Sequence, residues 1–445
     1  MPILFRYILA ALVALLLAHA TFAQRVFNLQ QCIDMAIENS IVIDKAELVL
    51  QDRELDMQGL RHDRLPNING FTNIYNNFGQ SQDIFGNNAR NDNFNGTLGV
   101  SSVYSILNNG RIRNSIQKTK REREAGEQDL ALLKRETTLK TIQAFLHVLL
   151  KKEICKSVDT VFWFAKNQLQ KVQASKDLGA ASLTVLYEAK ANYEREQEKN
   201  RQAHYAIDKA MLELKQLINI DRDQDFNIVS EVQDLSILST PSYKSEDLYT
   251  ALLAQHPVLK KYAFLKEALE FEQKAIKSQL YPTVDANLTL GSFYFNNLTS
   301  GFGKTPLFNQ LQNNFSQQIG LSINLPIFNK HAVKIAVQKN KIQQAEQAKA
   351  VEYEKLIILQ DLENRMLDLS NYQEQLKLAT TVLESAKKAF ELSYKSYDAG
   401  RISIYDLNTS RSNLFMAESE LIQTKYNLLF THVVVHYLTT GNTEL

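Results

Sequence analysis

Apolar residues recur at alternating steps of three and four along two long stretches of the chain. The stretch from 330 to 399 contains neither Pro nor Gly, and in the stretch from 110 to 176 only Gly110 and Gly126 occur. The apolar positions of the second stretch are Leu359, Leu362, Met366, Leu369, Leu376, Ala379, Leu383, Ala386 and Phe390. This period of about 3.5 residues is typical of supercoiled helices that pack knobs into holes. We predict two long helices, at about 110–176 and 330–398.

A Gly and a Ser follow each long helix at the same spacing, Gly179 with Ser182 and Gly400 with Ser403. Glycine suits the left-handed residue after a helix, and serine suits the N-cap of the next one. Return helices are therefore expected at about 182–218 and 403–440. In the second of these, leucine recurs every seven residues from Leu407.

Two other regions change to a period of two, which predicts half-buried β-strands. Apolar and small side chains alternate with polar ones in both; examples are Phe94, Leu98, Val100, Tyr104, Val284, Leu288, Ile319, Leu321 and Ile323. We predict β-hairpins at about 67–106 and 283–327, with polar loops at 77–92 and 296–314. Strands of about ten residues are long enough to cross a bilayer when they are tilted. A soluble two-layer sheet is the alternative reading.

Four strands cannot close a barrel in a membrane, where open sheet edges are not tolerated. The smallest known barrels have about eight strands. If these strands cross a membrane, several chains must share one barrel. Oligomerisation therefore follows from the number of strands.

The two halves of the chain repeat one another. Pro66 returns as Pro282, and Gly179 returns as Gly400, 221 positions later. We assign 24–235 to the first repeat and 236–445 to the second, which opens with a helix at about 245–280. A duplication of this length makes each half a unit that needs its copy beside it.

Near its start the chain has a basic residue, Arg6, then an apolar run at 8–17, then small residues ending at Ala23. This order is typical of a secretory signal peptide, which we assign to 1–23. The remaining sequence has no apolar run of about 18 residues, which argues against a membrane-spanning helix. The 445 residues include 50 Lys and Arg against 49 Asp and Glu, for a formal net charge of +1. This balance does not indicate a nucleic-acid surface.

The sequence gives no support for catalysis, a metal site or a cofactor. It lacks a phosphate-binding loop and a nucleophile elbow. His432 and His436 share a helix face, but only valines lie between them, and packing is the better explanation than metal binding. Cys32 and Cys155 are expected to pack as small apolar residues rather than to form a disulfide. The alternating charges of 118–127 are expected to form a solvated helix face.

The order of these elements, with three local motifs, resembles the TolC family of outer-membrane efflux proteins. The motifs are Ala36-Ile37-Glu38-Asn39-Ser40, Leu321-Ser322-Ile323-Asn324-Leu325-Pro326-Ile327-Phe328-Asn329 and Tyr397-Asp398-Ala399-Gly400-Arg401-Ile402-Ser403. The resemblance covers essentially all of the chain after the signal peptide.

This resemblance implies a mainly α fold with a transmembrane β-hairpin pair, in which duplicated antiparallel coiled-coil helices form an α-barrel. Four strands per chain would contribute to one 12-stranded barrel of a homotrimer in the outer membrane. The trimer would extend into the periplasm as a passive exit duct for small molecules, such as drugs or metals. Its partners would be a periplasmic adaptor (membrane fusion protein) and an inner-membrane pump. Two alternatives stay open: type I protein secretion, and a periplasmic coiled-coil adaptor or structural protein.

The resemblance also implies a gate at the periplasmic entrance. Tyr397 matches a gating tyrosine, and Asp406 matches the first of two constricting aspartates. The second aspartate falls on Thr409, and the gating arginine falls on Ile402, next to Arg401. An aspartate that ties the gate shut is replaced by Val185. For Asp406 the alternative role is that of a solvated acid in the first turn of a helix, favoured by the helix dipole.

The turns themselves are implied as the contact sites for the adaptor. Gly179, Ser182, Gly400 and Ser403 are the residues concerned. Helix capping is the alternative role for these four residues, and the two roles are compatible.

Overall fold

The computed structural model describes residues 26–82, 86–221, 226–229, 245–299 and 305–441. The predicted signal peptide at 1–23 lies outside these residues. Within them, no helix combines the length and the hydropathy needed to cross a membrane.

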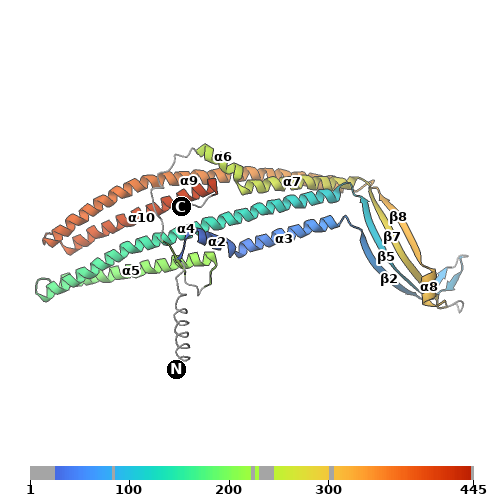
Figure 1. Ribbon diagram of the computed structural model, residues 1–445, viewed down its shortest axis with the longest axis horizontal. Helices are drawn as coiled ribbons and strands as arrows, with labels where there is room; N and C mark the ends of the chain where they lie inside the picture. The colour runs from blue at the N-terminus through green and yellow to red at the C-terminus, as the bar shows by residue number, and fades with distance from the viewer. Residues whose placement is uncertain (1–25, 83–85, 222–225, 230–244, 300–304, 442–445) are drawn as a thin grey trace, which may run out of the picture. The chain divides into compact units, whose positions relative to one another are not determined.

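Two long helical hairpins dominate the chain (Figure 1). Helix α4 (Arg111–Asp177) is followed by α5 (Leu183–Ile218), and α9 (Ala332–Asp398) is followed by α10 (Ile404–Thr440). At about 1.5 Å per residue, α4 and α9 are each on the order of 100 Å long. The apolar seam predicted on α9 is confirmed, because Leu362, Leu369 and Ala379 are buried.

The chain forms two compact units, and each unit takes segments from both repeats. The first unit is Met1–Lys45, Leu130–Pro257 and Glu354–Leu445, and the second is Ala46–Asp129 and Val258–Tyr353. The compact units therefore differ from the two sequence repeats, because α4 and α9 each run through both units.

The core of the first unit lies where α4, α5 and α10 meet α2 (Leu29–Glu38). Cys32, Ile142, Leu149, Leu214 and Ile218 are almost completely buried there. Burial raises the pKa of the Cys32 thiol to about 12, so that this cysteine is an uncharged packing residue, as predicted. The short parallel strands β1 (Val26–Phe27) and β6 (Asn227–Ile228) lie beside this core.

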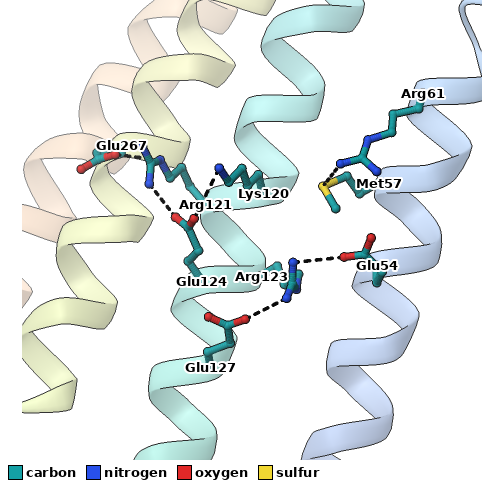
Figure 2. Close-up of polar contacts among 9 residues, drawn as sticks. All are labelled: Glu54, Met57, Arg61, Lys120, Arg121, Arg123, Glu124, Glu127 and Glu267. Carbon is teal, nitrogen blue, oxygen red and sulfur yellow. Dashed lines mark hydrogen bonds and ion pairs between the residues drawn. The ribbon is translucent and has the colours of Figure 1, made fainter.

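In the second unit, ion pairs connect α4 to α3 (Ile41–His62) and to α7 (Pro257–Lys277), as Figure 2 shows. Arg123 Nη1 lies 3.1 Å from Glu54 Oε2, and Arg121 Nε lies 2.8 Å from Glu267 Oε2. Beyond the figure, Lys118 Nζ lies 2.9 Å from a carboxylate oxygen of Glu272. The prediction that 118–127 forms a solvated face holds only for Lys120 and Glu127, which are exposed. The other charged side chains of this run that form these ion pairs are partly buried, because α4 has a helix on either side.

The helix expected at about 245–280 is divided at Pro257. Helix α6 (Ser245–Gln255) ends one residue before His256, α7 begins at Pro257, and a 3₁₀ turn, η2 (Ser278–Leu280), completes the segment. Proline disfavours helical geometry in the residue before it and is well suited to the first position of a helix.

The four main strands form one antiparallel sheet in the order β2-β5-β7-β8. They are β2 (Asn67–Asn77), β5 (Asn93–Leu107), β7 (Thr283–Asn297) and β8 (Ser316–Asn324). Each repeat supplies a hairpin, and β5 pairs with β7 across the repeats. The loops carry β3 (Gln80–Gln82), β4 (Asn88–Arg90) and α8 (Leu307–Asn313).

The register gives the sheet one more apolar face and one more polar face, most clearly in its central rows. Cross-strand partners share a face, and one such row is Ile68, Ser102, Leu288 and Ile319. The neighbouring row on the opposite face is Asn69, Ser101, Thr289 and Gln318. The apolar face is open within the chain: Ile319 is 83% exposed. The alternation predicted from the sequence is therefore confirmed.

Two glycines allow the repeats to join. Gly99 on β5 is paired with Gly291 on β7. A Cβ atom at Gly99 would lie 2.5 Å from the carbonyl oxygen of Leu290 and 2.8 Å from the ring of Phe71. The backbones of β5 and β7 can adopt this spacing only because neither residue has a side chain.

We predict that Gly99→Ala destabilises the sheet by roughly 1 to 3 kcal/mol, the usual cost of forcing extra volume into a packed site. Gly320→Ala is the matched control, because a Cβ atom there has no neighbour within 4 Å. Denaturant unfolding of the purified protein, followed by the β-sheet circular dichroism signal, measures both variants. Equal midpoints for the two variants would contradict the role of the glycine pair.

Candidate functional site: the hairpin tips

The two hairpin turns have the same backbone geometry. Gly179 and Gly400 have positive φ angles of 77° and 70°. At each turn the glycine N–H donates to a carbonyl three residues back, and the next N–H donates to one five residues back, at 2.8 to 2.9 Å. This is the Schellman arrangement, which satisfies the last carbonyls of α4 and α9. The conformation favours glycine, which explains the position of both turns.

Both return helices begin with a serine N-cap, but the residue three positions after the serine differs between them. Ser182 Oγ accepts from Val185 N at 3.3 Å, and Ser403 Oγ accepts from Asp406 N at 3.2 Å. Only at the second tip does the cap continue, because Asp406 Oδ2 accepts from Ser403 N at 3.1 Å and from Ser403 Oγ at 2.7 Å. Val185 occupies the same position in the first repeat and has no such group.

The predicted gate residues are placed by these contacts. The hydrogen bonds from the Ser403 hydroxyl and backbone N–H hold the pKa of Asp406 below its ordinary value, so its carboxylate is charged at neutral pH. Thr409 Oγ1 donates to the carbonyl of Tyr405 at 3.0 Å, which ties it to its own helix. Arg401 is exposed and enters the turn through its backbone N–H. Asp406 and Ser403 thus lie together, whereas Tyr397 faces the other hairpin.

Tyr397 joins the two hairpins close to their tips. Gln168 Nε2 donates to Tyr397 Oη at 2.6 Å, from α4 to α9. Burial raises the pKa of the Tyr397 phenol, which keeps it neutral. Beside this bond lies a buried apolar cluster of Val172, Ala189 and Ile404. The tips of the first unit are therefore packed against one another through both apolar and polar contacts.

A buried arginine makes a second polar contact between the hairpins. The guanidinium of Arg411 lies 3.6 Å from the ring centroid of Phe164, and its Nη2 donates to the carbonyl of Thr160 at 3.0 Å. Its Nη1 has no hydrogen-bond partner among the described residues. Burial lowers the pKa of Arg411 to about 10, against the opposing effects of Glu196 and Glu418. The guanidinium stays charged, at an electrostatic cost.

Sequence reasoning did not identify Gln168, Phe164 or Arg411. Thr160, Phe164, Gln168 and Val172 are each four residues apart, so they form a single stripe along α4. The sequence shows this spacing, but the stripe contains both polar and apolar residues, so a pattern of apolar residues alone does not include it.

The first tip presents apolar surface and a groove. Leu178 is 86% exposed, and Leu183 and Tyr187 are also exposed. A groove of about 610 Å³ lies between α4 and α5 and includes Leu169, Ala174, Leu186 and Tyr187. At the second tip, Tyr405 is exposed in the same way. Exposed apolar side chains beside a groove are features of surfaces that bind other proteins.

Comparisons with known proteins agree with this architecture. A family model for outer membrane efflux proteins matches residues 32–219 and 248–433, once in each repeat. No curated protein matches the chain. Because the family forms outer-membrane channels, the alternative of a periplasmic coiled-coil adaptor does not hold.

Solved structures show the same fold at low sequence identity. The CmeC outer membrane channel of Campylobacter jejuni is 18% identical, with a TM-score of 0.76 over 93% of this chain and 85% of that chain. CusC is 15% identical, with a TM-score of 0.75 over 93% and 92%. VceC of Vibrio cholerae is 15% identical, with a TM-score of 0.74 over 94% and 97%. The chain belongs to the outer membrane efflux protein (TolC) family, as a non-enzymatic channel of the outer membrane that extends into the periplasm.

Proposed function

We propose that this channel is the passive exit duct of a tripartite efflux system for small toxic molecules, such as drugs or metals. A periplasmic adaptor and an inner-membrane pump would complete the system. The observation that carries this proposal is the surface at the tips, where exposed apolar side chains lie beside a groove at the end of the first hairpin and Tyr405 is exposed at the end of the second. The pump would supply the energy, and the channel would supply the path.

Family membership implies a trimeric channel, and the sheet offers the means of closing it. Strands β2 and β8 each pair on one side only among the described strands, and the apolar face of the sheet is uncovered. Backbone groups left unpaired in lipid cost several kcal/mol each. Three copies joined edge to edge would pair every strand in one 12-stranded barrel, with the apolar face toward lipid.

The same tips would close the periplasmic entrance. Tyr397 and Asp406 would act in the gate, with Arg401 and Thr409 as their neighbours. Gly179, Ser182, Gly400 and Ser403 would shape the turns that dock the adaptor. The Gln168–Tyr397 bond supports a closed contact because it ties the second hairpin to the first.

For the gate, Asp406→Ala should raise single-channel conductance in planar bilayers, because the charged side chain would no longer narrow the entrance. Ser403→Ala is the matched control: it breaks the cap shared by these two residues and keeps the carboxylate. If Asp406 gates directly, Ser403→Ala leaves conductance unchanged. Equal increases in both variants would assign the effect to helix capping, and no increase in either would remove Asp406 from the gate.

For the contact between hairpins, Tyr397→Phe should weaken it by about 1 kcal/mol, because the buried Gln168 amide loses its acceptor. Adding Gln168→Leu should recover most of that loss, since no polar group is then left unpaired. Hydrogen exchange of α10 amides in the intact protein is the measurement. Tyr394→Phe is the control, because the ring of Tyr394 packs on Phe164 and Phe390. Strictly additive effects of the two substitutions would show that Gln168 and Tyr397 do not interact.

For the efflux partnership, Ala180→Arg should reduce both photocrosslinking of the tip to the adaptor and efflux of a fluorescent dye from intact cells. Ala180 is exposed, and its side chain is not part of either cap, so the trimer should persist. Gln202→Arg, at an exposed position farther along α5, is the control. Unaltered crosslinking and dye efflux in Ala180→Arg would contradict docking at this tip. Normal dye efflux alongside lost export of a protein would favour type I secretion.

A further inference from the structure

Three potential metal ligands meet between α4 and α5, away from the tips. Cys155 and Asp159 are one helical turn apart on α4, and His204 faces them from α5. One ligand atom from each lies within 4.8 Å of the other two. Cys155 is 2% exposed, whereas the side chains of Asp159 and His204 are about half exposed. The thiol is fixed in the packed interface, and the other two groups lie at its edge.

The distances between these ligand atoms are already close to those in a site that holds a metal ion. His204 Nε2 lies 3.1 Å from Asp159 Oδ1, and Cys155 Sγ lies 3.9 Å from Asp159 Oδ2. In a tetrahedral zinc site, metal–ligand distances of about 2.0 to 2.3 Å place neighbouring ligand atoms roughly 3.3 to 3.8 Å apart. Small side-chain rotations would therefore suffice, and the helices need not move.

The donor set selects a class of metal. Thiolate and imidazole favour zinc and its neighbours, whereas magnesium and calcium require oxygen ligands. Asn200, one turn from His204 on α5, donates from Nδ2 to Asp159 Oδ1 and so orients the carboxylate. Such supporting hydrogen bonds accompany metal ligands in established sites. Three protein ligands would leave one position for water.

The same two helices provide a comparison that isolates the role of the thiol. His147 Nδ1 lies 4.0 Å from Glu213 Oε2, and both side chains are about half exposed. That pair joins α4 to α5 as an ordinary histidine–carboxylate contact. Among the described residues, one group of three potential metal ligands occurs, Cys155, Asp159 and His204. The pair of His147 and Glu213 has no third described ligand of this kind beside it.

The second repeat does not contain these ligands. At the offset of 221, Cys155, Asp159 and His204 correspond to Leu376, Thr380 and Lys425. The group therefore belongs to the first hairpin only, and it is not part of the duplicated architecture.

We propose that Cys155, Asp159 and His204 bind one zinc-class divalent cation per chain, which links α4 to α5. On binding, the Cys155 S–H bond breaks, a sulfur–metal bond forms, and the proton leaves to solvent. His204 coordinates as the neutral imidazole. Asn200 acts as a positioning residue that holds the Asp159 carboxylate.

The test uses the full-length protein in detergent, reduced, stripped with a chelator and titrated with Co²⁺ or Zn²⁺. We expect one ion per chain, a thiolate-to-Co²⁺ charge-transfer absorption band, and a higher Tm with Zn²⁺. Cys155→Ala should abolish the band, and Cys32→Ala should retain it. Asn200→Ala should weaken binding on the order of tenfold. Absence of the band from the unaltered protein, or its loss in Cys32→Ala alone, would overturn the proposal.

A second pair of variants decides the case if Cys155→Ala fails to fold. His204→Gln and His147→Gln change partly exposed histidines on the same helix pair, and both should fold. We expect His204→Gln to lose Zn²⁺ binding and the Tm increase, and His147→Gln to keep both. Equal Zn²⁺ affinity in these two variants would show that Asp159 and His204 form only an ion pair.

Discussion

The unpaired backbone groups along β2 and β8 are the constraint on which the architecture depends. The sheet satisfies its hydrogen bonds internally between four strands, but among the described residues each outer strand is paired on one side only, and the apolar face is uncovered. In water, such edges promote aggregation, and in lipid they are not tolerated. A channel of this family is implied to be trimeric, and in the barrel that we propose the neighbouring copies would pair with those edges. The glycine pair at 99 and 291 meets the same demand inside the chain, because it lets the two repeats approach closely enough to form one sheet.

Duplication explains the scaffold, and the two sites that we propose lie where the repeats depart from one another. Both tips have the same glycine turn and the same serine cap. Their caps differ where Val185 corresponds to Asp406, and this difference places a charged carboxylate in the cap of the second hairpin only. The cluster of Cys155, Asp159 and His204 is the reverse case, since it occurs on the first hairpin only. If a metal ion fixes the first hairpin, the second hairpin would be the one that moves at the entrance.

Sequence patterns predicted the long helices, the turns and the strands because each depends on local repetition or on a single residue type. Apolar periods identified the seams, and glycine identified the turns. The break at Pro257 followed from a known property of proline, although the helix was expected to be continuous. Gln168 and Arg411 could not be found in this way, because their importance arises from the other hairpin. His204 is 49 positions from Cys155, so the proposed metal site could be found only from the packing of α4 against α5.

The gate that we propose requires a contact between the hairpins that can open and close. Its apolar part is small, with Val172, Ala189 and Ile404 fully buried. The Gln168–Tyr397 bond contributes about 1 kcal/mol, the usual net value of a hydrogen bond. Arg411 adds a cation–π contact, but its burial and its unpaired Nη1 offset part of that gain. Opposing contributions of this kind leave a contact that the binding of a partner could shift. The core around Leu149 and Leu214, which includes Leu429 and Val433 of α10, is more extensively buried, so in this proposal the tips would separate while that core stays packed.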